Sequence, residues 1–128
     1  MCIIMNYVNH TLNSDPYFLI DTVRNRLKIA GESCYRDAAK FFEPINNWLA
    51  DFLQNDAGKL TVDFEIKSFN LTAAEILFNM TKCMNANASK GQEIIVNFSV
   101  FENNDTAYKL AKNFWEEFSD VKLSIIKR

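Results

Sequence analysis

Short stretches of the chain alternate apolar with polar residues, the period of two that is typical of a half-buried strand. The clearest stretch is residues 60–67, in which Leu60, Val62, Phe64 and Ile66 alternate with polar residues. Its second face is fully polar, so one face alone is expected to be buried. Alternation also predicts strands at 26–30, 93–100 and 121–126, and the apolar run 17–21 is predicted to pair with 26–30 as a β-hairpin across residues 22–25.

Three longer segments place apolar residues at the three- and four-residue spacing of an amphipathic helix. The first is predicted at residues 36–54, with Pro44 inside it, where the missing backbone donor can bend a helix. The third follows the N-cap residues at 103–105 and reaches Phe118.

The second helix, predicted at residues 72–87, begins with a capping box. Thr72 is predicted as the N-cap and Glu75 follows at the third helical position, so each side chain can bond a free backbone N–H of the first turn. Cys83 lies on the apolar stripe of this helix, and we expect it to be buried as a small hydrophobic residue.

The order of these elements, β-β-α-β-α-β-α-β, predicts an α/β fold. Strands that alternate with helices favour parallel pairing through right-handed crossovers. Three strands have a polar second face, which favours helices on one side of the sheet only. We therefore expect a two-layer protein with a mixed five-stranded sheet and three helices on one face. Residues 1–14 are interpreted as an N-terminal extension in which some residues can form a strand. Residues 15–128 are interpreted as one domain.

Composition narrows the function classes. A chain of 128 residues is long enough to bury a core, and its 14 basic and 16 acidic residues give a net charge of -2, so no nucleic-acid partner is expected. Three cysteines without a CxxC pair favour reduced thiols in a cytoplasmic protein. The chain has neither the apolar core of a signal peptide nor a run long enough to insert into a membrane.

A search for enzyme motifs finds no Walker loop, GxGxxG, GxSxG or HExxH, so we predict no catalytic residue, no metal and no cofactor. Asp63 and Glu65 share one face of a strand, where a general acid and base could work together, but we interpret them as solvated charges beside Lys67. Cys34 follows a turn glycine near a helix start, which can activate a thiol, but a structural or incidental role is favoured.

The junction at residues 68–72 connects the clearest strand to the capped helix. Ligands and regulatory groups gather at the carboxyl ends of parallel strands, and a helix N-terminus stabilises a phosphate group. A phosphorylated Thr72 would bring nearly two negative charges to that end of the helix. The simpler interpretation is that Thr72 is only an N-cap, worth about 1 kcal/mol.

Three segments then resemble a known family: Gly31–Tyr35, Phe41–Ile45 and Trp48–Leu49 are similar to one stretch of the SiaC-like regulatory phosphoproteins of bacteria. The strand ending at Phe69–Asn70 resembles the family's strand before its Asn-Thr-Ser-Ser turn. The order of elements agrees from Asp15 to Lys127.

This resemblance implies a fold similar to the STAS domains of anti-sigma-factor antagonists, and a binding protein in place of an enzyme. It implies that a partner kinase phosphorylates the threonine after the turn asparagine and that a phosphatase reverses the modification. It also implies that the unmodified form binds and activates a diguanylate cyclase, which places the protein in the control of cyclic-di-GMP and biofilm formation.

Aligned without gaps, Asn70 matches the family's asparagine, Leu71 takes the place of its phosphoacceptor threonine and Thr72 that of the serine that follows. We therefore predict Thr72 as the first phosphoacceptor candidate and Ser68 as the second. The predicted partner-binding turn consists of Phe69, Asn70, Leu71 and Thr72. The alternative is a constitutive binder that has lost the switch.

Three other functions stay open at this point. A STAS-like module would bind a small ligand or nucleotide at the same strand end. An enzyme would have to use Asp63, Glu65 or Cys34. An oligomerisation domain would expose apolar residues on the outer face of the sheet, where Ile95 and Phe101 are expected.

Overall fold

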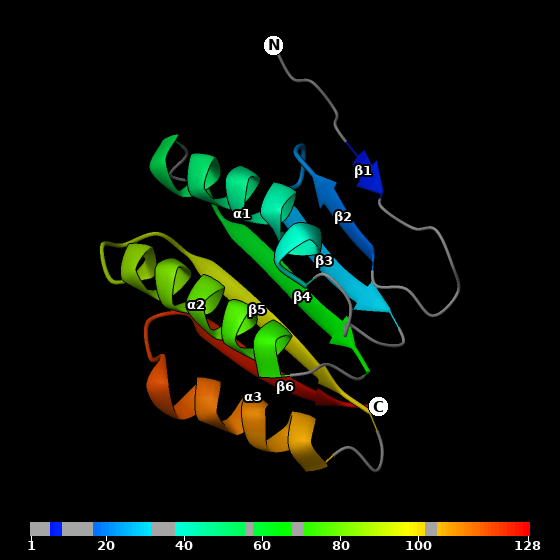
Figure 1. Ribbon diagram of the computed structural model, residues 1–128. Helices are drawn as coiled ribbons and strands as arrows, with labels where there is room; N and C mark the ends of the chain where they lie inside the picture. Colours follow the sequence, from blue (N-terminus) through cyan, green and yellow to red (C-terminus); the bar gives the residue numbers. More distant parts are fainter. Residues whose placement is uncertain (1–5, 9–16, 32–37, 56–57, 68–70, 102–104) are drawn as a thin grey trace.

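A six-stranded sheet runs through the computed structural model, with its strands in the order of the sequence (Figure 1). The structure describes residues 6–8, 17–31, 38–55, 58–67, 71–101 and 105–128. The strands are β1 (Asn6–Val8), β2 (Tyr17–Asp21), β3 (Arg26–Gly31), β4 (Leu60–Ile66), β5 (Ile94–Val100) and β6 (Lys122–Lys127).

Strand directions divide the sheet into an antiparallel and a parallel part. β2 pairs antiparallel with both β1 and β3, whereas β3, β4, β5 and β6 are parallel to their neighbours. The predicted hairpin between β2 and β3 is confirmed. In its turn, the Asp21 carboxylate accepts hydrogen bonds from the backbone N–H groups of Val23 and Arg24, both at 3.0 Å, and Asn25 adopts a φ of +53°. Asp and Asn favour turns because their side chains bond nearby backbone groups and tolerate positive φ.

Three helices, α1 (Ala38–Asn55), α2 (Leu71–Ala88) and α3 (Asp105–Glu117), each connect one parallel strand to the next. Right-handed crossovers that always advance to the adjacent strand place every helix on the same face of the sheet. Figure 1 shows α1, α2 and α3 side by side on that face. The predicted two-layer α/β class, a mixed sheet covered by three helices on one face, is confirmed.

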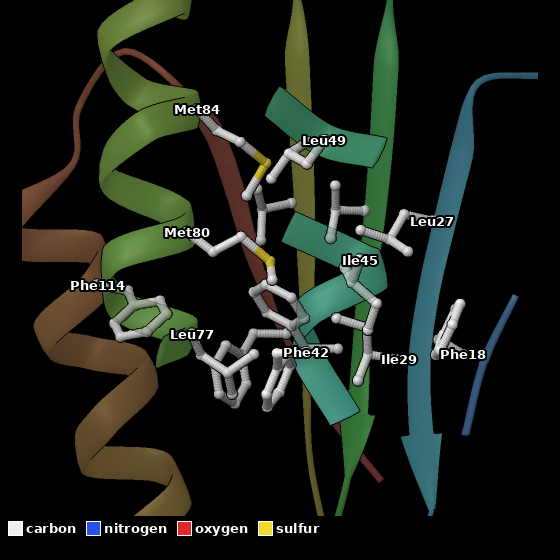
Figure 2. Close-up of a cluster of buried hydrophobic side chains, with 14 of the residues drawn as sticks. Phe18, Leu27, Ile29, Phe42, Ile45, Leu49, Leu77, Met80, Met84 and Phe114 are labelled. Atoms are coloured by element: carbon white, nitrogen blue, oxygen red, sulfur yellow. The ribbon is translucent and has the colours of Figure 1, made fainter. Parts of the chain in front are cut away.

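The core lies between the helices and the sheet. Val62, Phe64, Val96 and Phe98 point from β4 and β5 into this layer and are at most 1% exposed. Figure 2 shows side chains of all three helices meeting those of the strands. Burial of large apolar side chains contributes about 1.5–3 kcal/mol each, which makes this layer the main source of stability.

Phenylalanine rings join the elements of the core. Phe98 of β5 meets Phe64 of β4 and Phe114 of α3 edge to face, with ring centroids 5.6 and 5.5 Å apart. Phe78 of α2 lies 5.4 Å from Phe114 and 4.9 Å from Phe118. Such geometry adds to the stabilisation from burial, so the abundant phenylalanines are mainly a structural feature.

The predicted count of five strands is wrong by one. Asn6–Val8 forms β1, which pairs with Leu19–Asp21 at the edge of the sheet. A strand of three residues is too short to show a period of two in the sequence. Part of the predicted extension is therefore an edge strand, while the domain boundary placed at residue 15 stays a prediction.

The expectation that Cys83 is buried is also wrong, because its side chain is exposed. Leu77, Met80 and Met84 form the buried stripe of α2. Consecutive helical residues are separated by about 100°, so Cys83 lies at the margin of this stripe, on the side of α1. The periodicity of a sequence does not show which residues at the edge of an apolar helix face are buried by a neighbouring helix.

Candidate functional site

The carboxyl ends of the parallel strands meet at one edge of the sheet. The Lys67 N–H, just after β4, donates to the Gly31 carbonyl at the end of β3, at 3.1 Å. The Arg128 N–H, just after β6, donates to the Val100 carbonyl at the end of β5, at 2.9 Å. Segment 68–72 leaves β4 at this edge and enters α2.

Only part of the predicted partner-binding turn can be placed. Ser68, Phe69 and Asn70 lie outside the described residues. α2 begins at Leu71, and the side chain of Thr72, its second residue, is exposed. The predicted N-cap role of Thr72 is therefore wrong, because an N-cap precedes the first helical residue.

Cationic side chains gather near this edge. The Lys67 ammonium lies 5.3 Å from the ring centroid of Phe101, the residue after β5. The ammonium groups of Lys127 and Lys112 lie 4.9 and 5.9 Å from the ring centroid of Tyr108 in α3. Ammonium groups held over aromatic rings keep positive charge in place. Together with the positive end of the α2 dipole, they favour negative charge at this edge.

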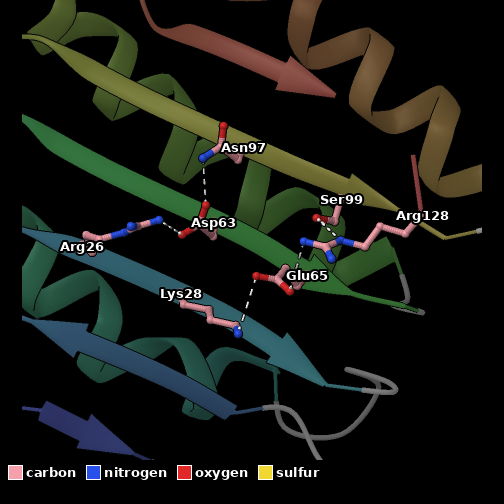
Figure 3. Close-up of polar contacts among 7 residues, drawn as sticks. All are labelled: Arg26, Lys28, Asp63, Glu65, Asn97, Ser99 and Arg128. Atoms are coloured by element: carbon pink, nitrogen blue, oxygen red, sulfur yellow. Dashed lines mark hydrogen bonds and ion pairs between the residues drawn. The ribbon is translucent and has the colours of Figure 1, made fainter. Parts of the chain in front are cut away.

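Asp63 and Glu65 are not the solvated charges beside Lys67 that the sequence suggests. Asp63 is 15% exposed and uses both carboxylate oxygens: Arg26 Nη2 donates at 3.0 Å and Asn97 Nδ2 at 2.8 Å (Figure 3). The register explains the contact with Asn97, because Asp63 and Asn97 are direct partners on parallel strands.

Glu65 is paired in the same way. Its carboxylate lies 3.6 Å from Lys28 Nζ and 3.8 Å from Arg128 Nη2, while Arg128 Nε donates to Ser99 Oγ at 3.2 Å (Figure 3). These contacts and those of Asp63 form an ion-pair network on the face of the sheet opposite the helices.

Sequence reasoning missed the partners in this network, namely Arg26, Lys28, Asn97, Ser99 and Arg128. The signal was present in part: 26 and 28 are polar positions of β3, and 63 and 65 are polar positions of its neighbour β4. Their pairing requires the parallel register, which the alternation of one strand does not contain.

The other apolar and reactive candidates give weaker sites. Ile95 and Phe101 are half-buried, and the large hydrophobic residues exposed in the described ranges are Val23 and Ile126. Cys34 lies outside the described residues.

Within the ranges that the structure describes, no three His, Cys, Asp or Glu side chains gather closely enough to bind a metal ion. No described helix is both long and apolar enough to cross a membrane.

Fold and site together define a two-layer α/β protein whose parallel strands end at one edge, beside the start of α2. The chain belongs to the SiaC family of regulatory phosphoproteins, because the family's sequence model matches residues 9–128. The resemblance seen in the sequence is thereby confirmed. Its further likeness to STAS domains stays a prediction.

Solved structures agree with this assignment. SiaC of Pseudomonas aeruginosa is 17% identical, with a TM-score of 0.85 over 98% of this chain and 100% of that one. SiaC in a crystal structure with the diguanylate cyclase SiaD, whose activator it is in Pseudomonas aeruginosa, is 18% identical, with a TM-score of 0.84 over 95% of this chain and 99% of that one. At this identity the likeness establishes the fold. No curated protein gives a significant sequence match.

Proposed function

We propose that this protein is a non-enzymatic cytoplasmic regulator that binds a diguanylate cyclase, and that phosphorylation within residues 68–72 controls the binding. Membership of a family of regulatory phosphoproteins is the observation that carries the proposal. A structural relative of the same fold is the activator of a diguanylate cyclase, which supports this class of partner.

Thr72 is the phosphoacceptor that the geometry favours among the described residues of this segment. Thr72 is an exposed residue in the first turn of α2, where a kinase can reach it. A kinase would transfer the γ-phosphoryl group of ATP to its hydroxyl oxygen and release ADP and a proton, and a phosphatase would return the hydroxyl by hydrolysis. The positive end of the α2 dipole would favour the added charge.

Phosphate at this position would weaken partner binding by charge and bulk. A phosphorylated threonine carries nearly two negative charges and a large hydration shell. A partner that covers the start of α2 would have to remove that water, and this costs free energy unless the partner supplies a cation to pair with the phosphate. The unmodified form is therefore the binding form in this proposal.

A constitutive binder is the second candidate, because the resemblance, aligned without gaps, implies that Leu71 replaces the family's phosphoacceptor threonine. In that case Thr72 would be an ordinary helix residue, and the protein would bind its partner irrespective of kinase activity. The two candidates share the partner and differ only in the effect of charge at residue 72.

Binding to the diguanylate cyclase of the same organism separates them, with Thr72→Asp as the charged variant and Thr72→Ala as the neutral one. We expect Thr72→Asp to weaken the complex at least about tenfold, equivalent to about 1.4 kcal/mol, and Thr72→Ala to bind like wild type. Ser119→Asp is the matched control, because Ser119 is exposed after α3, remote in sequence from this turn. Calorimetric titration and the rate of cyclic-di-GMP formation give two readouts.

The possible results are distinct. Equal binding of wild type, Thr72→Asp and Thr72→Ala, together with weakened binding of Ser68→Asp, would move the acceptor to Ser68. Equal binding of all these variants would support the constitutive binder. A wild-type protein that neither binds nor activates the cyclase would contradict both candidates.

A further inference from the structure

We infer that the outer edge of β6 accepts an extended segment of another protein as a seventh strand, and that this segment carries an acidic residue beside Lys112 and Lys127. The inference goes beyond the proposed function, because it assigns a second interaction surface that involves neither the cyclase nor residues 68–72. It can therefore be tested without the cyclase and without phosphate.

β6 is an edge strand. It stands last in the strand order of the sheet and, among the described strands, pairs with β5 alone. Figure 1 shows β6 on the side of the sheet where α3 lies. Its six residues, Lys122–Lys127, span roughly 20 Å at the usual rise of a strand. β1, the edge strand on the opposite side, has three residues, so β6 offers the longer edge.

The register shows which backbone groups of β6 point away from the sheet. The Arg128 N–H donates to the Val100 carbonyl at 2.9 Å, so residue 128 directs its backbone toward β5. Successive residues of a strand direct their backbone groups to opposite sides, so residues 124 and 126 also bond to β5. The outward N–H and C=O groups belong to Leu123, Ile125 and Lys127. Such groups are a template for an added strand.

Two lysines beside this edge keep their positive charge. The ammonium groups of Lys112 and Lys127 lie 5.9 and 4.9 Å from the ring centroid of Tyr108 in α3. Within the described ranges, no carboxylate forms an ion pair with either ammonium. The cations of the open face differ, because Arg26 and Lys28 are each paired with a carboxylate. An acidic side chain on a seventh strand would therefore meet two cations that the described part of the protein does not neutralise.

Ile126 supplies an apolar contact on the other face of the same edge. Its side chain is 37% exposed and lies on the open face, because the neighbouring Ile125 packs against the core. A partner residue opposite Ile126 would cover it, and the next partner residue, opposite Lys127, would lie on the helix face beside the ammonium groups. The segment that fits this edge therefore places an apolar residue next to an acidic one in an extended chain.

A second copy of this chain is a poorer occupant. Two copies of β6 that pair through their outward groups about a two-fold axis at Ile125 reach the greatest overlap, and this sets Lys122 of each chain opposite Arg128 of the other. Like charges directly opposite each other on paired strands are destabilising. Lysines on an edge strand discourage such self-pairing, whereas an acidic strand is attracted to them. The charge of the edge therefore points to a different protein.

Hydrogen exchange of the free protein, followed by NMR, tests the edge itself. The amides of Leu123, Ile125 and Lys127 should exchange at least about tenfold faster than those of Ser124 and Ile126, which are bonded to β5. Slow exchange of the outward amides in a protein that sedimentation shows to be monomeric would overturn the inference, because the edge would already be covered.

A capped synthetic peptide of sequence Asp-Val-Thr-Val-Thr-Val-Asp is the probe for the occupant. It reads the same in both directions, so an aspartate can lie beside Lys127 whichever way the strand runs. At about ten times its Kd it should slow exchange of the outward amides about tenfold. The same peptide with lysine in place of aspartate should bind at least about tenfold more weakly. A peptide methylated at its central backbone nitrogens should not bind, because it cannot donate strand hydrogen bonds.

Charge reversal in the protein supplies the second measurement. We expect Lys127→Glu and Lys112→Glu each to weaken binding of the aspartate peptide at least about tenfold and to strengthen binding of the lysine peptide. Lys40→Glu is the matched control, because Lys40 is an exposed residue of α1, and it should leave both affinities unchanged. Unaltered circular dichroism of all three variants would show that they are folded.

The outcomes are distinct from those for the proposed function. Equal binding of the aspartate and lysine peptides, or of the methylated and unmethylated peptides, would overturn the inference. Protection of the outward amides that rises with the concentration of this chain alone would identify a second copy and also overturn it. No cyclase is present in these experiments, so these results leave the proposed function standing, and a failure to bind the cyclase would leave this inference standing.

Discussion

The two faces of β4 differ in how their side chains are packed. Val62 and Phe64 point toward the helices and are almost completely buried. Asp63 and Glu65, which alternate with them, point to the open face and are enclosed by cations and an amide. One strand of seven residues therefore carries a hydrophobic core on one side and an ion-pair network on the other.

The contrast separates stability from surface properties. Apolar burial gives the helix side a large and non-directional stabilisation. Partly exposed ion pairs contribute little, because water screens them and their side chains lose freedom. The network leaves Asp63 and Glu65 paired, while the described residues that line a cavity of about 360 Å³ between α1 and α2 are uncharged. The open face is therefore the less suitable of the two for an apolar partner.

The largest expected effect is on the helix side. Phe98→Ala removes a fully buried ring that contacts Phe64 and Phe114, and it should lower the free energy of unfolding by about 3–5 kcal/mol. Urea denaturation followed by circular dichroism measures this loss. A loss below about 1 kcal/mol would mean that the helix side does not dominate stability.

A smaller loss is expected on the open face. Asp63→Ala removes the acceptor of the hydrogen bonds from Arg26 and Asn97 and should cost about 1.5–3 kcal/mol. The comparison with Arg26→Ala sharpens the result, because the Arg26 side chain is 51% exposed and its removal should cost at most about 1 kcal/mol. If Asp63→Ala cost as much as Phe98→Ala, the contrast between the faces would be lost.

The smallest effect is expected at the start of α2. Thr72→Ala should change the free energy of unfolding by no more than about 0.5 kcal/mol, because Thr72 is an exposed helical residue and alanine favours helices. The same urea titration applies. Destabilisation of about 1 kcal/mol or more would contradict the assignment of Thr72 as an ordinary exposed residue of the helix.

Periodicity predicted the central elements well. The strand predicted from Leu60 onward ends at Ile66, and the second helix begins one residue before its predicted start. Both elements are long, and their apolar residues recur at a regular spacing because one face of each element is buried in the core between the helices and the sheet. β1 was expected only as strand content somewhere within residues 1–14, because it has three residues and is defined by its pairing with β2.

The site was less accessible to sequence reasoning. Thr72 was anticipated as a phosphoacceptor candidate, but its position within the helix depends on a boundary that sequence patterns locate only to one or two residues. The partners of Asp63 and the exposure of Cys83 depend on the register of the sheet and on how closely α1 approaches α2. Neither quantity is encoded locally in the chain.

Control of partner binding by phosphorylation at residues 68–72 is tested by mass spectrometry of the protein isolated from its own cells, with fragmentation to locate phosphate. We expect part of the population to carry one phosphate within residues 68–72, with Thr72 as the first candidate. Absence of phosphate from this segment under all growth conditions, or phosphate confined to other residues, would contradict control of partner binding at the strand-to-helix junction.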